Sequence, residues 1–504
     1  FFSDMDVVEL PVVWRAAVAA RNFEVGEEIL REPPLLLLPK IRQDTPLFDS
    51  LDAIANKHHV AEKVLYPCIY YCRASEEIKS KVKEFYVPRL DEDGLQYKRY
   101  HGAVTEVAEL PELKASGVPW EELLDFILIL RCNVHMIGDG TKTSALFYLG
   151  SKVTHSCDPN CMALAIGIQL VYRAIRPIVK GEPITFSYIS GFDLWKSTPA
   201  RRELLLDQRF FTCCCLRCTR EDRCRYRICP ECGDQNLCRY ESGQLSYMGQ
   251  DPTPPTDTPW FCQNAECGKK FKDEDMDLEV EKALQYNVLE NFFSTKQITS
   301  VHPELPQTML KVCEEKLGRN HWLTLLMIYS HMAMHHTALN SGQKPLSTGK
   351  DCLVWADRLC KWMEVAMPNT MQQAVIAKFA GQTAEVYGVP ELASLWFTRA
   401  IPVLRVHHGN HGKDIREMLA YIEEHGSPEQ IVVASKPCRV IDMGKNVPVV
   451  SVKNSPTTNG KPSNDEGKIT EAPEAGPVDP AVTKKQAKRE KIKEQRKLRK
   501  GGRA

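Results

Sequence analysis

A cluster of cysteines near the middle of the chain constrains its fold more than any other feature. Three of them stand at C-x-C-x-x-C spacing, namely Cys213, Cys215 and Cys218. This spacing delivers three thiolates to one metal ion, and tetrahedral zinc needs a fourth soft ligand from elsewhere in the chain. Cys157 is the natural candidate. If Cys157 joins the three, the loop around Tyr188 is tied to the loop around His155, and a pocket must lie between these two loops.

The motifs around this cluster resemble the SET domain of protein-lysine methyltransferases, and specifically its SMYD (SET and MYND) branch. They occur in the family's order and at similar spacing: Thr154-His155-Ser156-Cys157-Asp158-Pro159-Asn160-Cys161, then Gly181-Glu182-Pro183-Ile184-Thr185 with Tyr188, and then the cysteines that follow Phe211. The resemblance covers most of residues 7–220 and, more loosely, the helical region to about 425. It implies an α+β SET fold, S-adenosylmethionine as the cofactor and a protein lysine as the methyl acceptor.

The resemblance also implies roles for single residues. Tyr188 matches the catalytic tyrosine, which aligns the acceptor amine with the sulfonium methyl group. The positions that match cofactor contacts are Trp14, Arg15, Ala16, Asn133, Thr154, His155 and Phe211. Asn133 has a second interpretation, because an asparagine at this place can simply cap the end of a helix. A Ser-His-Asp hydrolase is disfavoured, since serine follows histidine directly and no nucleophile-elbow glycines surround them.

The chain departs from the family pattern at four positions. SMYD-like proteins carry a Gly-x-Gly on the first strand pair, which lets the backbone approach the cofactor. Here those positions are Trp14 and Ala16, so either cofactor affinity is lowered or the loop is rebuilt. Thr154 replaces an asparagine and keeps a hydroxyl donor without the carboxamide. Arg209 stands where relatives have an aromatic that walls the lysine channel, and a cation there repels a substrate ammonium unless it pairs with an acid or points away.

A second metal pattern follows the first. Its members are Cys229, Cys232, Cys262 and Cys267. A C-x-x-C pair with a later cysteine pair is typical of a zinc ribbon, in which two knuckles hold one ion. The two sets of four cysteines therefore predict two zinc ions. The MYND finger of the family is absent, because only Cys68 and Cys72 occur between Pro39 and Trp120.

Hydrophobic periodicity and turn residues predict how the chain is organised. Paired strands are expected around Gly26, a helical insert follows, and a buried helix is expected at 119–137. Helical pairs broken by proline and glycine, together with similarity to the SMYD C-terminal domain, predict a TPR-like array. The predicted domains are 1–212 (SET domain, with its helical insert at about 41–118), 213–228 (post-SET zinc segment), 229–272 (zinc ribbon), 273–434 (helical, TPR-like) and 435–504 (disordered basic tail).

The formal net charge of zero hides an asymmetry. Residues 483–504 hold 11 lysines and arginines against 2 glutamates, so this tail is basic and the rest of the chain is acidic. The block 484–503 fits a nuclear-localisation signal or a nonspecific nucleic-acid contact, and a merely solvated tail is the alternative. No apolar run of about 18 residues occurs, which predicts that the chain does not enter a membrane.

The distribution of cysteines bears on the compartment. Of the 19 cysteines, 10 lie between Cys213 and Cys267, and most of the others are scattered singly through helical sequence. This pattern favours reduced, zinc-loaded thiols in a protein of the cytoplasm and nucleus over the disulfides of a secreted protein. The sequence opens Phe1-Phe2-Ser3 without an initiator methionine, which indicates a fragment or a processed start.

The predicted function is methyl transfer from S-adenosylmethionine to a protein lysine, with histones and chromatin among the expected substrates and settings. The first alternative is a catalytically weak or inactive SET scaffold, which binds protein partners through its helical domain. The second alternative is a nucleic-acid-associated zinc protein, supported only by the ribbon and the basic tail.

Overall fold

The computed structural model describes residues 2–10, 14–39, 45–138, 143–239, 259–289, 305–345, 347–367, 370–410 and 412–437. Contacts divide the chain into a unit of Phe1–Met443 and a unit of Gly444–Ala504. Nearly all of the predicted basic tail lies outside the described residues, so its disorder remains a prediction. Among the described residues, no helix combines the length and the apolar character needed to cross a membrane.

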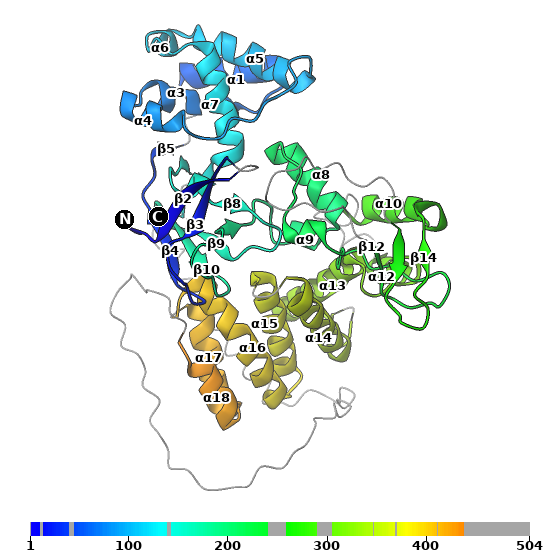
Figure 1. The fold of residues 1–504 in the computed structure, drawn as a ribbon. Coiled ribbons are helices and arrows are strands. Elements are labelled where there is room, and N and C mark those ends of the chain that lie inside the picture. The colour runs from blue at the N-terminus through cyan, green and yellow to red at the C-terminus, as the bar shows by residue number, and fades with distance from the viewer. Residues whose placement is uncertain are drawn as a thin grey trace. The chain divides into compact units, whose positions relative to one another are not determined.

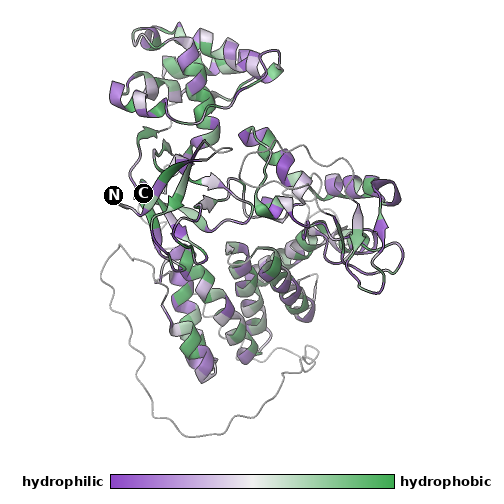
Figure 2. Cartoon of the chain, in the orientation of Figure 1, coloured by the Kyte–Doolittle hydropathy of each residue, from purple (hydrophilic) through white to green (hydrophobic). Residues whose placement is uncertain are grey.

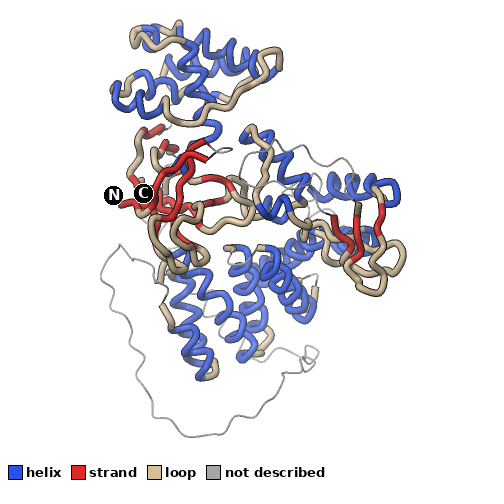
Figure 3. Tube along the Cα trace, in the orientation of Figure 1, coloured by secondary structure: helices blue, strands red, loops and turns tan. Residues whose placement is uncertain are grey.

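The N-terminal half contains a set of small sheets, drawn as red strands in Figure 3. The strands run in the order β1 Phe2–Ser3, β2 Met5–Leu10, β3 Trp14–Ala19, β4 Glu28–Glu32, β5 Leu36–Leu38, β6 His135–Met136, β7 Ser144–Leu146, β8 Thr154–His155, β9 Cys161–Ile166, β10 Gln169–Ala174 and β11 Thr185–Phe186. They form sheets in the orders β1-β4-β10-β9, β2-β3, β5-β7-β6 and β11-β8. The turn predicted at Gly26 precedes β4, and this glycine has a φ of 91°, which a residue with a Cβ rarely adopts.

The two motifs predicted to face each other do meet, as a short parallel pair. Thr154 of β8 pairs with Thr185 of β11, and His155 pairs with Phe186. The fully buried Asn160 joins the same segments, because its Oδ1 accepts the N–H of Thr185 at 2.8 Å. Its side-chain amide also donates to a backbone carbonyl of the second motif. One asparagine thus satisfies backbone groups that the short strands leave unpaired.

The predicted insert is helical and has its own hydrophobic core. Its helices are α1 Pro46–His58, α2 Glu62–Leu65, α3 Pro67–Cys72, α4 Glu76–Val82, α5 Leu95–Ala108 and α6 Pro111–Lys114, and the predicted buried helix follows as α7 Trp120–Asn133 (Figure 1). The rings of Tyr71 and Phe126 stack in this core with their centroids 4.3 Å apart. Leu51, Val104 and Ile127 are buried around them. Helices therefore occupy the region where the SMYD branch has its zinc finger.

The cysteine-rich region combines short elements. They are η1 Gly150–Lys152, η2 Asp193–Trp195, α8 Thr198–Arg209, α9 Leu216–Thr219, β12 Leu237–Arg239, β13 Trp260–Cys262, β14 Lys270–Phe271 and η3 Asp273–Asp275. Strands β12, β13 and β14 form one antiparallel sheet, the expected frame of a ribbon. Helix α8 ends where Phe210 adopts a φ of 63°, so the chain turns sharply into Phe211 and the cysteines.

The C-terminal region is helical, as predicted. Its helices are α10 Leu278–Tyr286, α12 Leu305–Lys316, α13 Trp322–Ser341, α14 Gly349–Ala366, α15 Met371–Val386, α16 Pro390–His408, α17 Lys413–His425 and α18 Pro428–Ser435. Gly342, Gly388 and Gly409 all have positive φ and lie just beyond helix ends, where the sequence predicted breaks. Figure 2 shows hydrophobic and hydrophilic residues together on α16 and α17, as expected of helices with one buried face. Nothing specific to TPR repeats appears, so that comparison stays a prediction.

One hydrophobic core joins the SET cysteines to the helical region. Trp195, which follows the Tyr188 loop, is fully buried in it. The ring of Trp195 lies 5.2 Å from that of Trp362 on α14 and 5.7 Å from that of Tyr329 on α13. The loop beyond Tyr188 is therefore held by the helical region through close aromatic contacts.

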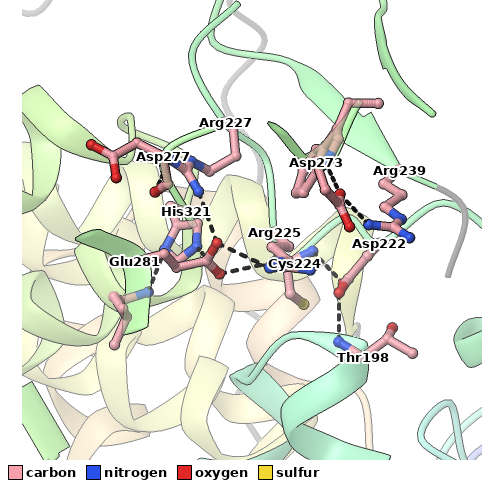
Figure 4. A network of polar contacts seen from close by, with 12 residues as sticks. Thr198, Asp222, Cys224, Arg225, Arg227, Arg239, Asp273, Asp277, Glu281 and His321 are labelled. Carbon is pink, nitrogen blue, oxygen red and sulfur yellow. Dashed lines mark hydrogen bonds and ion pairs between the residues drawn. The ribbon is translucent and has the colours of Figure 1, made fainter. Parts of the chain in front are cut away.

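A buried carboxylate lies where the cysteine-rich region meets the helices (Figure 4). Glu281 on α10 has a side chain that is only 4% exposed. Its two oxygens each lie 2.8 Å from a guanidinium nitrogen, of Arg225 and Arg227 respectively. His321 completes the group, since its Nδ1 accepts the N–H of Leu323 and its Nε2 lies 3.3 Å from Glu281. The ring is therefore neutral, with Nε2–H donating to the carboxylate.

This network sets the protonation state of Glu281. Burial alone raises the pKa of a carboxyl group, but the hydrogen bond from His321 and the nearby guanidinium of Arg225 outweigh it, so the pKa of Glu281 lies well below its ordinary value. Burial lowers the pKa of His321, in keeping with its neutral form. Other ion pairs of the network, such as Arg239 with Asp273, fasten the ribbon nearby.

Replacing this carboxylate should destabilise the fold in a pH-dependent way. Glu281→Gln removes the anion that faces the buried Arg227 and the partly buried Arg225, and we expect a loss of about 3 kcal/mol in the free energy of unfolding. The depressed pKa means that the carboxylate's contribution is complete above the unfolded pKa of about 4.3 and is lost as pH falls through the folded pKa. Denaturant unfolding at pH 7 and at about pH 3 measures both effects.

The matched control is Glu279→Gln on the same helix. Its side chain is 83% exposed and pairs with Lys282 on the surface, so the change should be within about 0.5 kcal/mol. A Glu281→Gln protein as stable as this control at pH 7, or a difference that grows as the pH falls, would contradict the assigned role of the network.

Candidate active site and metal centres

The structure brings Cys157 together with the three cysteines that follow α8. The sulfur atoms of Cys157, Cys213, Cys215 and Cys218 all lie within 4.8 Å of one another, and all four residues are buried. The Cys157 sulfur is 4.0 Å from that of Cys213 and 3.6 Å from that of Cys218. Zinc–sulfur bonds of roughly 2.3 Å in a tetrahedron give sulfur–sulfur separations of roughly 3.8 Å. The four side chains therefore fit one zinc ion.

Hydrogen-bond donors surround these sulfur atoms, as expected around zinc thiolates. Four thiolates and one Zn²⁺ carry two net negative charges, which need compensation in a buried place. Arg201, itself fully buried, places a guanidinium nitrogen 3.4 Å from the sulfur of Cys218. The backbone N–H of Cys157 donates to the sulfur of Cys215 at 3.4 Å.

His155 connects the cluster to the Tyr188 loop through its side chain. Its Nδ1 accepts the backbone N–H of Tyr188 at 3.0 Å, so the hydrogen of the neutral ring sits on Nε2, which lies 3.3 Å from the sulfur of Cys157. Burial lowers the pKa of His155 to about 3, which keeps the ring neutral. The resemblance placed His155 among the cofactor contacts. Its imidazole also connects the cysteine cluster to the Tyr188 loop, which the sequence did not reveal.

The second set of cysteines also converges. The sulfur atoms of Cys229, Cys232, Cys262 and Cys267 lie within 4.8 Å of one another. The Cys229 and Cys267 sulfurs are 3.9 Å apart, and those of Cys232 and Cys262 are 3.6 Å apart. These separations fit a second tetrahedral zinc site. None of the cysteines in the described part of the chain forms a disulfide, in line with the reduced thiols expected from the sequence.

A cavity of about 290 Å³ lies beside the first cluster. Six residues predicted to bind cofactor or substrate line it: Arg15, Asn133, Thr154, His155, Tyr188 and Phe211. Ala16 does not line the cavity and is fully buried in β3, on the opposite side of the strand from Arg15. The side chain of Trp14 lies outside the described part of the chain.

Tyr188 presents a protonated hydroxyl in this cavity. Its hydroxyl donates to the carbonyl of Val153 at 2.9 Å, and burial raises its pKa far above the ordinary value. Its ring contacts His155 at 5.2 Å and Phe211 at 6.2 Å between centroids, the latter nearly perpendicular. The phenol is thus a fixed neutral group, suited to orienting a polar acceptor rather than to removing a proton.

Asn133 ends α7 and lines the cavity at the same time. Its side-chain amide donates at 2.9 Å to the carbonyl of Ile129, one turn earlier in the same helix. A longer contact of 3.4 Å reaches the carbonyl of Tyr86 in the insert. The residue that caps the end of α7 is Val134, so Asn133 is the last helical residue rather than the cap.

Among the residues that the structure describes, no acidic side chain pairs with Arg209. Its Nη1 donates to the last carbonyls of α7, those of Arg131 at 2.8 Å and Cys132 at 3.1 Å. Its Nη2 lies 3.5 Å from the carbonyl of Tyr188. The carbonyl end of a helix carries a partial negative charge, so this is a favourable place for a cation. Arg209 thus fastens α8 to α7 and to the Tyr188 loop at the wall of the cavity.

Several lining residues were missed from the sequence. They are Glu84, Tyr86, Cys132, Ser151, Lys152, Thr212 and Cys214. Most adjoin a motif residue, so their neighbourhood was a signal: Lys152 precedes Thr154 by two residues, and Thr212 follows Phe211. Glu84 and Tyr86 come from the insert between α4 and α5, and no local pattern connects them to a site that is distant in sequence.

Comparisons with known proteins agree with this geometry. Residues 15–189 match the family model of the SET domain. The chain is 38% identical over 92 residues to the histone-lysine N-methyltransferase SMYD3 of Mus musculus, covering 18% of this chain and 20% of that protein. It is 32% identical over 111 residues to the N-lysine methyltransferase SMYD2 of Homo sapiens, and this match covers 21% of this chain and 25% of that protein. It is 25% identical over 266 residues to the histone-lysine N-methyltransferase ASHR1 of Arabidopsis thaliana, and this match covers 43% of this chain and 55% of that protein.

The chain thus spans between about a fifth and about half of these relatives. A solved structure of Rubisco LSMT bound to AdoMet aligns with 85% of this chain and 94% of its own, at 12% identity and a TM-score of 0.30, a likeness too weak to support a conclusion. The crossing of β8 and β11, the cysteines behind it and the family match define a SET domain. The relatives that this region resembles include proteins of the SMYD type.

Removing one ligand of the first cluster should release one metal ion. We expect Cys218→Ser protein to hold one zinc ion fewer than the unmodified protein, because a tetrahedral site needs all four thiolates. The region around Tyr188 should then exchange its amide hydrogens faster, since Cys157, the sulfur partner of His155, is no longer held by a metal ion. Zinc analysis and hydrogen exchange measure the two effects. The control is Cys214→Ser, an adjacent cysteine outside the cluster, and full zinc content in the Cys218→Ser protein would refute the shared site.

Arg209 should matter for stability rather than as an obstructing charge. Arg209→Met removes the hydrogen bonds to two carbonyls of α7, and we expect the free energy of unfolding to fall by about 2 kcal/mol. Arg209→Lys keeps the charge but loses the forked geometry of the guanidinium. The free energy of unfolding of this variant should lie between those of the unmodified protein and the Arg209→Met protein. Chemical denaturation measures the series. A methionine variant as stable as the unmodified protein would show that these contacts do not hold the site together.

Proposed function

We propose that this protein transfers a methyl group from S-adenosylmethionine to a lysine side chain of a protein substrate. The observation that carries the proposal is the single cavity in the SET domain on which Tyr188, His155, Thr154 and Phe211 converge. The SMYD and ASHR1 relatives are named as lysine methyltransferases, which supports the same reaction class.

The lining residues suit such a cofactor. Phe211 offers an aromatic face on which adenine can stack. Thr154, buried in β8, offers a hydroxyl, and Arg15 lines the cavity while its guanidinium pairs with Glu84. When bound, the cofactor supplies an activated methyl group on sulfur.

The acceptor lysine must be oriented and neutral for in-line displacement. The Tyr188 hydroxyl and the carbonyl of Val153 together form a polar end at which an amine can be held. The aromatic rings of Phe186 and Phe211 flank Tyr188 and exclude water from it. Exclusion of water and the nearby Arg209 cation both favour the neutral amine over the ammonium.

The wider setting is part of the proposal. Two structural zinc ions would occupy the two cysteine clusters, and protein partners would bind the helical C-terminal domain. The basic block 484–503 supports residence in nucleus as well as cytoplasm, and contact with nucleic acid, on composition alone. A histone is one candidate substrate, as the names of SMYD3 and ASHR1 indicate for those proteins.

The competing function is a SET scaffold without catalysis. The features that favour it are Trp14 and Ala16 in place of family glycines, Thr154 in place of an asparagine and Arg209 in place of an aromatic. The cavity is present whether the protein is an enzyme or a scaffold. The two functions therefore differ in whether the cavity binds S-adenosylmethionine and whether methyl transfer follows.

Two substitutions separate cofactor binding from methyl transfer. Phe211→Ala removes the stacking face, and we expect S-adenosylmethionine to bind about 1 to 3 kcal/mol more weakly by calorimetry. Tyr188→Phe keeps the ring and removes the hydroxyl, so methyl transfer to a substrate pool should fall at least about tenfold while cofactor affinity changes little.

Tyr70→Phe in the insert is the control, because the Tyr70 side chain does not line the cavity. Zinc content and thermal unfolding confirm that each variant is folded. Absence of any cofactor binding by the folded, zinc-loaded protein would refute the proposed enzyme and leave the scaffold. Cofactor binding with equal transfer by the Tyr188→Phe protein would refute the role given to the hydroxyl.

A further inference from the structure

Lys152 is a buried cation whose hydrogen-bonding capacity is largely unused. The residue is only 5% exposed, and it lines the cavity beside Thr154. Its ammonium donates to one acceptor, the backbone carbonyl of Glu84, at 3.1 Å. It also lies 5.3 Å from the ring centre of Phe85 and 5.1 Å from that of Tyr148. An ammonium has three donors, so two remain without an acceptor among the described residues.

Two charged side chains accompany Lys152 on the same wall of the cavity. One carboxylate oxygen of Glu84 accepts hydrogen bonds from Arg15 and from the Tyr148 hydroxyl, each at 2.7 Å. The other carboxylate oxygen of Glu84 has no hydrogen-bond partner within the described part of the chain. Lys152, Arg15 and Glu84 together carry one net positive charge, and the carboxylate of Glu32 also acts on Lys152 electrostatically. Burial and the charge of Arg15 lower the pKa of Lys152, while the charges of Glu84 and Glu32 oppose this shift.

The Lys152 ammonium is incompletely paired, whereas the Glu84 side chain is 39% exposed. A buried charge is tolerated when it is paired and hydrogen-bonded, and Lys152 has no direct ionic partner among the residues that the structure describes. A ligand carboxylate could accept the two free N–H groups, while a ligand ammonium could donate to the free oxygen of Glu84. A chemical group that carries both charges on adjacent atoms is the α-amino-carboxylate of an amino acid.

We infer that Lys152 and Glu84 form the binding site for the amino-acid end of the cofactor, with Lys152 holding its carboxylate and Glu84 its ammonium. The inference rests on the proposed function, because it takes S-adenosylmethionine as the ligand of the cavity. Glu84 belongs to the insert, just beyond α4. The insert that stands in place of a zinc finger thus supplies a specificity-determining residue to the cofactor site.

Ligands that differ in this end provide the test. In calorimetry, Lys152→Met should weaken S-adenosylmethionine and S-adenosylhomocysteine by about tenfold or more, because a charge-assisted contact is lost. The same change should leave 5′-methylthioadenosine, which lacks the amino-acid end, within about twofold. Lys180→Met, on an exposed turn, is the matched control and should leave all three affinities unchanged.

A second variant reports on the ammonium. Glu84→Gln should weaken decarboxylated S-adenosylmethionine, which keeps the amine, by about tenfold, whereas Lys152→Met should affect this ligand by less than about twofold. Thermal unfolding without ligand distinguishes a binding role of Lys152 from a structural role. If Lys152 serves binding, the Lys152→Met protein should unfold at the same or a higher temperature, because a buried cation without an ionic partner has been removed. If the fold needs Lys152, the Lys152→Met protein should unfold at a lower temperature.

The outcomes distinguish the two claims. If the unmodified, zinc-loaded protein binds neither S-adenosylmethionine nor 5′-methylthioadenosine, the proposed function fails, and the inference fails with it. If it binds both, but Lys152→Met weakens both equally or neither, the inference alone is overturned. Selective loss of the ligands that carry a carboxylate, with unchanged or raised stability, supports it.

Discussion

The four-cysteine cluster behind the cavity is the constraint on which the rest of the site depends. It joins Cys157, at the end of β8, to three cysteines that lie more than fifty residues later in the chain. Because β8 and β11 are only two residues long each, their own hydrogen bonds cannot fix the crossing of the two motifs. Four thiolates that bind one metal ion can fix this crossing. The imidazole of His155 then carries this rigidity to the backbone of Tyr188, since one ring nitrogen faces the sulfur and the other accepts the Tyr188 N–H.

The helical C-terminal region is part of the same structural unit as the cysteine cluster. A single core contains the cysteine sulfurs, Trp195 and the inner faces of the helices. A second link lies at the SET sheet, where the buried Arg173 donates to the carbonyl of Val406 on α16 at 2.8 Å and pairs with the fully buried Glu28. Buried ionic groups of this kind specify one arrangement because a displaced charge has no other partner. Partners that bind the helices could therefore influence the Tyr188 loop through direct contacts.

Departures from the family pattern have physical compensations in this chain. Arg209 replaces an aromatic, but its guanidinium is occupied by the carbonyl end of α7, so the cation strengthens the wall of the cavity. The insert replaces a metal-stabilised finger with a hydrophobic core around Tyr71 and Phe126. It also brings Glu84 to the cavity, where Arg15 and Tyr148 hold one of its oxygens. Substitution of residues that line the cavity therefore need not prevent cofactor binding, as long as the charged groups that face the ligand are balanced.

The sequence by itself determined the SET architecture, the helical insert, the C-terminal helices and both sets of cysteines. The SET architecture follows from the resemblance of its motifs to the family, whereas cysteine spacing, helical periodicity and glycine at helix ends are local patterns that are each encoded within a few residues. It also picked out six residues that line the cavity, since motif residues such as Thr154 and Phe211 lie beside the cysteines. Only the tertiary structure decided where Arg209 points, that Ala16 lies away from the cavity, and that Glu84 and Lys152 meet. The direction of a side chain and the meeting of distant segments depend on packing between elements, and that information is not local in the chain.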